Sequence, residues 1–185
     1  MALSSQRIAM KKRKSKKSEA FLDDLCSAIF DSYLFRTRTS GISERQMQAE
    51  IRPLIAKYLE GHFKNAGYVK FDKMVHDNFY WEGQESSFQS DRSIFFGGRR
   101  YADYIILKPY KIAIEYKKSG GVAALNTLIG QGIMASASGD YDYCILIFQD
   151  ETKDKRILNS KDLDRERGFI DWLWDMFNIR LKIIK

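Results

Sequence analysis

A short, continuous apolar run in the second half of the chain limits the possible folds most: YDYCILIF, residues 141–148. A strand that is apolar along its whole length, rather than at alternate positions, is expected to be buried on both faces of a sheet. The preceding segment, GGVAALNTLIGQGIMASASG (120–139), predicts a helix of about four turns whose small residues suit close packing on that sheet. Together the two segments predict an α/β domain with a central mixed β-sheet flanked by helices.

The positive charge of the chain is concentrated at its beginning. Residues 1–17 contain seven Lys and Arg residues and no acid, whereas the rest of the chain has 24 basic and 24 acidic residues. We therefore expect a flexible basic tail at 1–17 and a single domain at 18–185. Its run KKRKSKK predicts salt-sensitive, sequence-independent binding to nucleic acid, with a localisation or RNA-binding tail as alternatives. The candidate DNA contacts in the tail are Lys11, Lys12, Arg13 and Lys14.

Apolar periodicity, capping residues and turn residues predict the remaining elements. In chain order these are a helix with Ser18 as N-cap, a helix from the SERQ capping box at Ser43 toward Ala66, strands within 73–82 and 86–96, strands at 101–107 and 111–117, a helix at 162–177 and a strand at 178–185. Pro53 predicts a kink or a boundary in the second helix, and Gly67 a C-cap. Gly97 and Gly98 predict a turn or bulge.

Two acids and an amine stand on the predicted strands 101–107 and 111–117. Glu115 and Lys117 are two residues apart, so their side chains leave the strand on the same face. A two-residue turn between the strands would pair Asp103 with Tyr116, on the opposite face. A three- or five-residue connection, or a bulge, would instead pair Asp103 directly with Glu115. The spacing permits a cluster of Asp103, Glu115 and Lys117 without requiring it.

Such a cluster would favour metal-assisted phosphodiester chemistry. Two neighbouring carboxylates repel each other and either take up a proton or bind a cation. Hard oxygen ligands favour Mg²⁺, with Mn²⁺ as a substitute, and both ions bind phosphate. The ammonium of Lys117 could then stabilise negative charge that develops in the transition state. The alternative is an exposed salt bridge at a sheet edge, which would contribute little.

Asp103, followed after eleven residues by Glu115-Tyr116-Lys117, resembles the pattern of the PD-(D/E)xK nuclease superfamily, which includes restriction endonucleases and archaeal-type Holliday junction resolvases. The resemblance covers roughly residues 43–150 and departs from the family at Ala102, where many members have Pro. It implies a restriction endonuclease-like αβββαβ core, with an extra N-terminal helix and a C-terminal helix and strand. It also implies catalytic roles for Asp103, Glu115 and Lys117, with Mg²⁺ held by the two acids.

Two further site residues are implied by the same resemblance. Resolvase-like members carry an acid on the helix before the sheet, for which Glu50 is the best match and Glu44 and Glu60 are alternatives. Several members carry a Gln on the helix after the ExK strand, and Gln131 fits that position. Arg99, Arg100 and Lys118 flank the strands beside glycines and are candidate phosphate contacts, or solvated charges at tight turns.

The function expected from these residues is Mg²⁺-dependent cleavage of DNA, with selectivity for structure similar to that of Holliday junction resolvases. The alternatives are a module that binds nucleic acid without cleaving it, a sequence-specific restriction-type enzyme, and an RNA-binding protein that acts through its tail. We expect a homodimer, because cutting two strands needs two sites. Apolar surroundings predict that Cys26 and Cys144 are free buried thiols of a cytoplasmic, nucleic-acid-associated protein, and no apolar run predicts a membrane helix.

Overall fold

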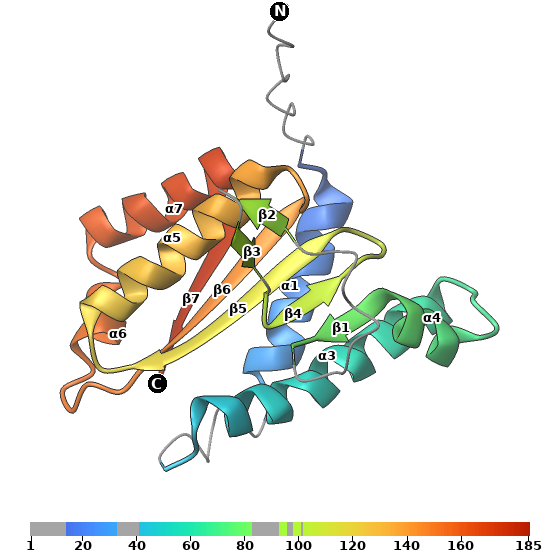
Figure 1. The fold of residues 1–185 in the computed structure, drawn as a ribbon, viewed down its shortest axis with the longest axis horizontal. Coiled ribbons are helices and arrows are strands. Elements are labelled where there is room, and N and C mark those ends of the chain that lie inside the picture. The colour runs from blue at the N-terminus through green and yellow to red at the C-terminus, as the bar shows by residue number, and fades with distance from the viewer. Residues whose placement is uncertain (1–13, 33–40, 83–92, 96–97, 101) are drawn as a thin grey trace, which may run out of the picture.

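A computed structural model of the protein describes residues 14–32, 41–82, 93–95, 98–100 and 102–185. It confirms an α/β fold with a five-stranded mixed sheet flanked by helices (Figure 1). The helices are α1 (Lys16–Phe30), α3 (Glu44–Asn65), α4 (Phe71–Asn78), α5 (Val122–Ser138), α6 (Arg156–Ser160) and α7 (Asp164–Phe177). The strands are β1 (Phe79–Trp81), β2 (Ser93–Phe95), β3 (Gly98–Arg100), β4 (Tyr104–Ile106), β5 (Ile112–Ser119), β6 (Tyr143–Asp150) and β7 (Ile179–Ile184).

The strand order of the main sheet is β1-β4-β5-β6-β7, and β2 and β3 form a separate antiparallel pair. β1, β4 and β5 are antiparallel neighbours, whereas β5, β6 and β7 run parallel to one another. Because β6 has a strand on each side and helices over both faces, all eight of its residues are buried. This arrangement confirms the central strand predicted from the apolar run.

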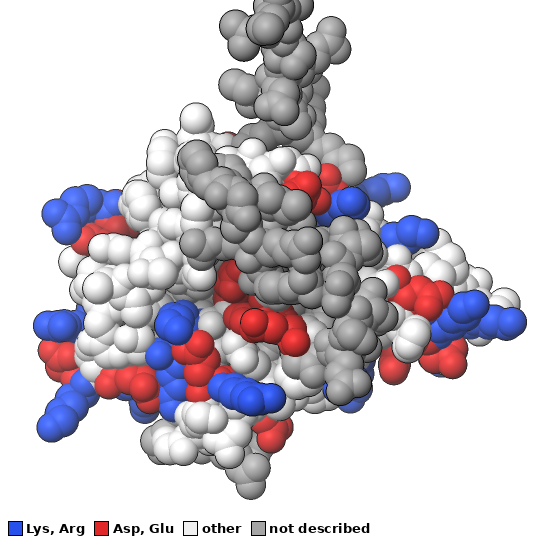
Figure 2. All heavy atoms as spheres, in the orientation of Figure 1, with Lys and Arg blue, Asp and Glu red and all other residues white. Residues whose placement is uncertain are grey.

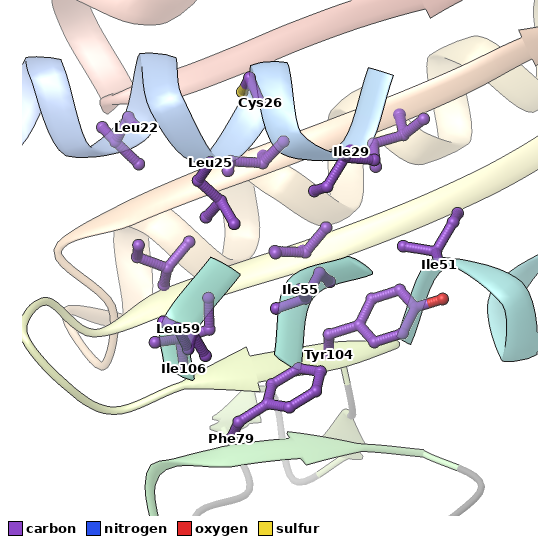
Figure 3. Packing of buried hydrophobic residues seen from close by; sticks show 14 of the residues in the cluster. Leu22, Leu25, Cys26, Ile29, Ile51, Ile55, Leu59, Phe79, Tyr104 and Ile106 are labelled. Carbon is purple, nitrogen blue, oxygen red and sulfur yellow. The ribbon is translucent and has the colours of Figure 1, made fainter. Parts of the chain in front are cut away.

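Two hydrophobic cores lie on the two faces of the sheet. On one face, apolar residues of α1 and α3 meet those of the sheet (Figure 3), among them Leu25, Ile55 and Tyr104. On the other face, α5 and α7 cover residues such as Ala113, Cys144 and Leu146. The sheet is therefore the middle layer of three, and the residues of β5 alternate between the two cores.

α5 packs closely on the sheet because it carries glycine at the point of contact. A Cβ atom on Gly132 would lie 2.7 Å from Cδ1 of Leu146, a fully buried residue of β6. No atom lies within 4 Å of the corresponding position on Gly130. Only one of these two glycines is therefore required by packing.

The first helix begins earlier than predicted. Ser15, not Ser18, is the N-cap of α1, because the Ser15 hydroxyl accepts a hydrogen bond from the Ser18 amide at 3.1 Å. Ser18 itself is buried and its hydroxyl accepts a hydrogen bond from the Tyr143 hydroxyl at 2.8 Å. Lys16 and Lys17, assigned to the flexible tail, belong to this helix, so the predicted boundary at residue 17 was wrong for them.

The second helix follows its prediction closely. Ser43 and Gln46 form the predicted capping box: each side chain accepts a hydrogen bond from the other residue's backbone amide. The helix passes through Pro53 without a boundary and ends at Asn65, and Gly67 has the positive φ of a helix terminus.

Two segments between the predicted elements differ from expectation. The predicted strand at 73–82 is mostly α4, and only Phe79–Trp81 is extended. In α4 the Asn78 side chain donates to the Met74 carbonyl one turn earlier, an interaction that a strand could not provide. Of the predicted strand at 86–96, residues 93–95 form β2, while 86–92 and 96, like Gly97, lie outside the described residues.

The short helix α6 was not predicted. Its first turn is held by Asp150, whose carboxylate accepts backbone hydrogen bonds from Ile157 at 3.0 Å and Leu158 at 2.9 Å. Within the part of the chain that the structure describes, none of the helices combines the length and the apolar character needed to span a bilayer.

Candidate active site

The register of β4 and β5 decides how Asp103 and Glu115 are placed. Tyr104 pairs with Ile114 and Ile106 with Ile112, so a five-residue connection joins the strands. Continuing this antiparallel register by one residue places Asp103 opposite Glu115. Of the two alternatives that the spacing allowed, the structure has the direct pairing.

The same row continues onto a third strand. Trp81 pairs with Tyr104, and the Glu82 amide donates to the Asp103 carbonyl at 3.0 Å, so Glu82 lies beside Asp103. Sequence analysis missed Glu82, although it directly follows the aromatic residues that form β1. Three acids, Glu82, Asp103 and Glu115, therefore occupy neighbouring positions on three strands.

Asp103 has a defined and mostly buried environment. Its side chain is directed toward α3, where its Oδ1 accepts a hydrogen bond from Gln48 Nε2 at 2.8 Å. Its Oδ2 accepts one from the Tyr116 amide at 2.6 Å. Burial raises the pKa of Asp103 to about 6, and the charges of Glu82 and Glu44 add to the increase, whereas the two hydrogen bonds oppose it.

Glu115 and Lys117 lie further along β5. Glu115 is half-buried and shares the α5 side of the sheet with Ala113, and its charge contributes to the raised pKa of the neighbouring Cys144, which burial chiefly causes. The Lys117 ammonium lies 3.1 Å from a carboxylate oxygen of Glu44. The other Glu44 oxygen accepts a hydrogen bond from the Lys118 amide, so Glu44 connects α3 to β5.

A polar pocket of about 520 Å³ opens beside Asp103. Three of the residues that line it come from the first turns of α3, which the Ser43 capping box begins at this edge of the sheet. The lining residues are Glu44, Arg45, Gln48, Trp81, Glu82 and Asp103. Figure 2 shows acidic atoms gathered near the middle of the face that Figure 1 views. The pocket thus combines carboxylates, an arginine and an aromatic ring.

Of the residues implied by the family resemblance, Asp103 lines this pocket, whereas Glu115, Lys117, Glu50 and Gln131 are not among its described lining residues. Glu50 is exposed on α3, and the acid of that helix that reaches the site is Glu44, named above as an alternative. Gln131 is half-buried on α5. Neither Glu50 nor Gln131 is among the described residues that line the pocket.

Two of the predicted DNA contacts have partners within the folded domain. The Lys118 side chain is 8% exposed, and its ammonium binds the Ile42 carbonyl and lies 2.9 Å from Glu151. The Lys14 ammonium donates to the Trp174 carbonyl at 2.6 Å and lies 4.3 Å from the centre of the Trp174 ring. Both lysines therefore have partners inside the folded domain, and their contact with phosphate stays a prediction.

The other predicted DNA contacts stay predictions. Arg99 and Arg100 lie on β3, and nothing is described of their side chains. Lys11, Lys12 and Arg13 fall outside the described residues.

The donor chemistry of the site fits a hard divalent cation. Among the described residues, no three His, Cys, Asp or Glu side chains are grouped closely enough to hold a metal ion by themselves. Mg²⁺ commonly needs only one or two carboxylates, with water and substrate phosphate as its other ligands. The raised pKa of Asp103 indicates that positive charge nearby would stabilise its ionised form.

The two cysteines are free and buried, as predicted, and burial raises the pKa of Cys26 to about 11.

No protein-family model matches the sequence, and comparisons with curated proteins and with solved structures find no match either. Inference about function therefore depends on the geometry and chemistry of the site.

Proposed function

We propose that this protein is a Mg²⁺-dependent DNA endonuclease of the PD-(D/E)xK type, structure-selective in the manner of Holliday junction resolvases. One observation carries the proposal: the β4–β5 register puts Asp103 opposite Glu115, with Lys117 two residues further along the same strand. This is the strand arrangement that the family pattern requires. An ordinary β-hairpin has no structural need for acids at positions 103 and 115.

The order of elements supports the same proposal. α3, β1, β4, β5, α5 and β6 follow one another as the αβββαβ core of restriction endonuclease-like folds would require, if α4 and the separate β2–β3 pair are taken as insertions. α1 would then be the extra N-terminal helix, and α7 and β7 the C-terminal additions. The site would lie where the antiparallel and parallel parts of the sheet meet.

Each residue of the site would have a separate role in cleavage. Asp103 and Glu115 would hold Mg²⁺, or Mn²⁺ as a substitute, which requires the Glu115 carboxylate to reach from the α5 side of the sheet to the Asp103 carboxylate, which is directed toward α3. The bound ion would supply Lewis-acid activation of the phosphodiester. Gln48 and the Tyr116 amide fix the orientation of the Asp103 carboxylate. Lys117 would stabilise negative charge on the phosphate as it develops, and Glu44 holds its ammonium in place. Two such sites in a homodimer would cut two strands.

A panel of DNA substrates tests the proposal. Wild-type protein would be incubated with four-way junction, flap, linear duplex and single-stranded DNA, with Mg²⁺ and with a chelator. We expect cleavage with Mg²⁺ only, and faster cleavage of branched DNA than of linear duplex. Binding of DNA without Mg²⁺- or Mn²⁺-dependent cleavage of any substrate would contradict the proposal.

One observation favours a second candidate, a nucleic-acid-binding module that keeps the fold without cleavage. Both oxygens of Asp103 accept hydrogen bonds from the protein, and Lys117 is paired with Glu44. Such internal pairing also suits a purely structural cluster. The substrate panel separates the candidates, because only the nuclease predicts metal-dependent products.

A further inference from the structure

Two arginines of α3 lie along one side of the candidate site. Arg45 and Arg52 are seven positions apart, which is about 10 Å along the helix and brings them to the same face. Both are exposed, and within the described residues neither has a carboxylate at ion-pair distance. Cations without a carboxylate partner among the described residues are available to bind an anion from outside.

An aromatic ring lies close to the second of these arginines and lines the same pocket as the first. Trp81 lines the same pocket as Arg45 and Asp103. Its ring centre lies 5.3 Å from the guanidinium carbon of Arg52. Trp81 remains partly exposed, although β1 holds its backbone opposite Tyr104. Trp81 therefore contacts one guanidinium group and shares its pocket with the other and with carboxylates.

This combination matches the chemistry of an unpaired nucleic acid strand. Guanidinium groups bind successive phosphates, and an exposed aromatic ring stacks on a base that no partner strand holds in a duplex. Bases inside a duplex are already stacked on their neighbours and cannot reach a ring in a pocket. The pocket volume of about 520 Å³ lies in the range of sites that enclose a small ligand such as one nucleotide.

We propose that Arg45, Trp81 and Arg52 form a track for a single DNA strand that leads to Asp103. The substrate class would then be DNA with unpaired nucleotides next to the phosphate that is cut, such as a flap or a splayed end. That statement about cleavage rests on the proposed nuclease function, whereas binding of the strand to the track does not.

Binding measured without metal tests the track separately from catalysis. Fluorescence anisotropy in a chelator would compare a labelled single strand of about 16 nucleotides, the upper size covered by one such site, with a blunt duplex of the same sequence. We expect Trp81→Ala to weaken single-strand binding about tenfold or more and to leave duplex binding nearly unchanged. Arg52→Gln, an exposed change that preserves folding, should weaken single-strand binding and lower its salt slope by about 0.7.

Trp172→Ala is the matched control, because Trp172 is exposed on α7, outside the pocket lining. It should leave single-strand binding at the wild-type level. Equal single-strand affinities of the wild type, Trp81→Ala and Arg52→Gln would overturn the track. Undiminished cleavage of flaps by Trp81→Ala would also overturn it while leaving the nuclease proposal intact. Trp81-dependent strand binding without any cleavage would refute the nuclease and leave the track.

Discussion

The protonation state of Asp103 links the structure of the site to its chemistry. Burial and the nearby carboxylates raise its pKa from the ordinary 3.8 to about 6. The folded state therefore keeps its proton at pH values where the unfolded state has lost it. Ionisation of Asp103 consequently lowers the free energy of unfolding as pH rises from about 4 to about 6. Cation binding near this carboxylate would offset that loss.

Glu82 provides a direct test of this electrostatic arrangement. The change Glu82→Gln removes one negative charge beside Asp103, so the pKa of Asp103 should fall below its wild-type value. NMR titration of the Asp103 side-chain carboxyl carbon would measure the shift.

Because metal binding requires the ionised carboxylate, the apparent Mn²⁺ affinity of the wild type should rise up to about pH 6 and then level off.

Glu50→Gln is the control for this titration, since Glu50 is exposed on α3 and is not among the pocket-lining residues. It should leave the pKa of Asp103 unchanged. The assignment of Glu82 to the site would be contradicted if both variants shifted the titration equally, or if neither did.

At the scale of elements, the sequence predicted those helices and strands whose position is decided by residues within the element itself. The apolar run 141–148 specified β6, and the SERQ sequence specified the start of α3, because each signal lies within the element itself. α6 depends instead on contacts from outside the element, the hydrogen bonds that its first turn donates to Asp150. Apolar periodicity therefore predicted strands and long helices better than short helices.

The candidate site follows the same division. The acids Asp103 and Glu115 were identifiable from spacing, but their pairing required the length of the β4–β5 connection. Glu82 and Gln48 join the site only through β1 and α3, which lie at distant sequence positions. Long-range register, rather than residue type, was the missing information.

A pair of glycines in α5 tests how the helix is fitted to the sheet. Gly130→Ala should raise the free energy of unfolding by up to about 1 kcal/mol, because alanine is a better helix former and meets no atom there. Gly132→Ala should lower it, because the new methyl group would overlap the fully buried Leu146. Urea denaturation of both variants would measure the changes. A stabilised Gly132→Ala protein would contradict the described packing of α5.

On the scale of the whole molecule, charge separates the tail from the folded domain. The excess of positive charge lies in residues 1–17, although Lys14, Lys16 and Lys17 are held by the domain. Deleting residues 1–13 should weaken DNA binding for all substrates and reduce its dependence on salt, because fewer counterions are released. The cleavage rate at saturating DNA should barely change.

Binding titrations at several salt concentrations would check this prediction, with a Lys14→Ala variant of the full-length chain as the comparison. Lys14 contacts α7, so its loss should affect stability more than the salt slope. An unchanged salt slope after the deletion would place the DNA-binding charge in the domain, for example at Arg45 and Arg52.

The central claim is that Asp103 and Glu115 act together on a phosphodiester through a divalent cation. The most direct measurement compares product formation by the wild type, Glu115→Gln and Asp103→Asn on flap and junction DNA with Mg²⁺, with circular dichroism to verify folding and Glu50→Gln as a matched control. We expect cleavage by the wild type and by Glu50→Gln, and none by the two folded site variants, which should still bind DNA. Cleavage at the wild-type rate by either Glu115→Gln or Asp103→Asn would contradict it.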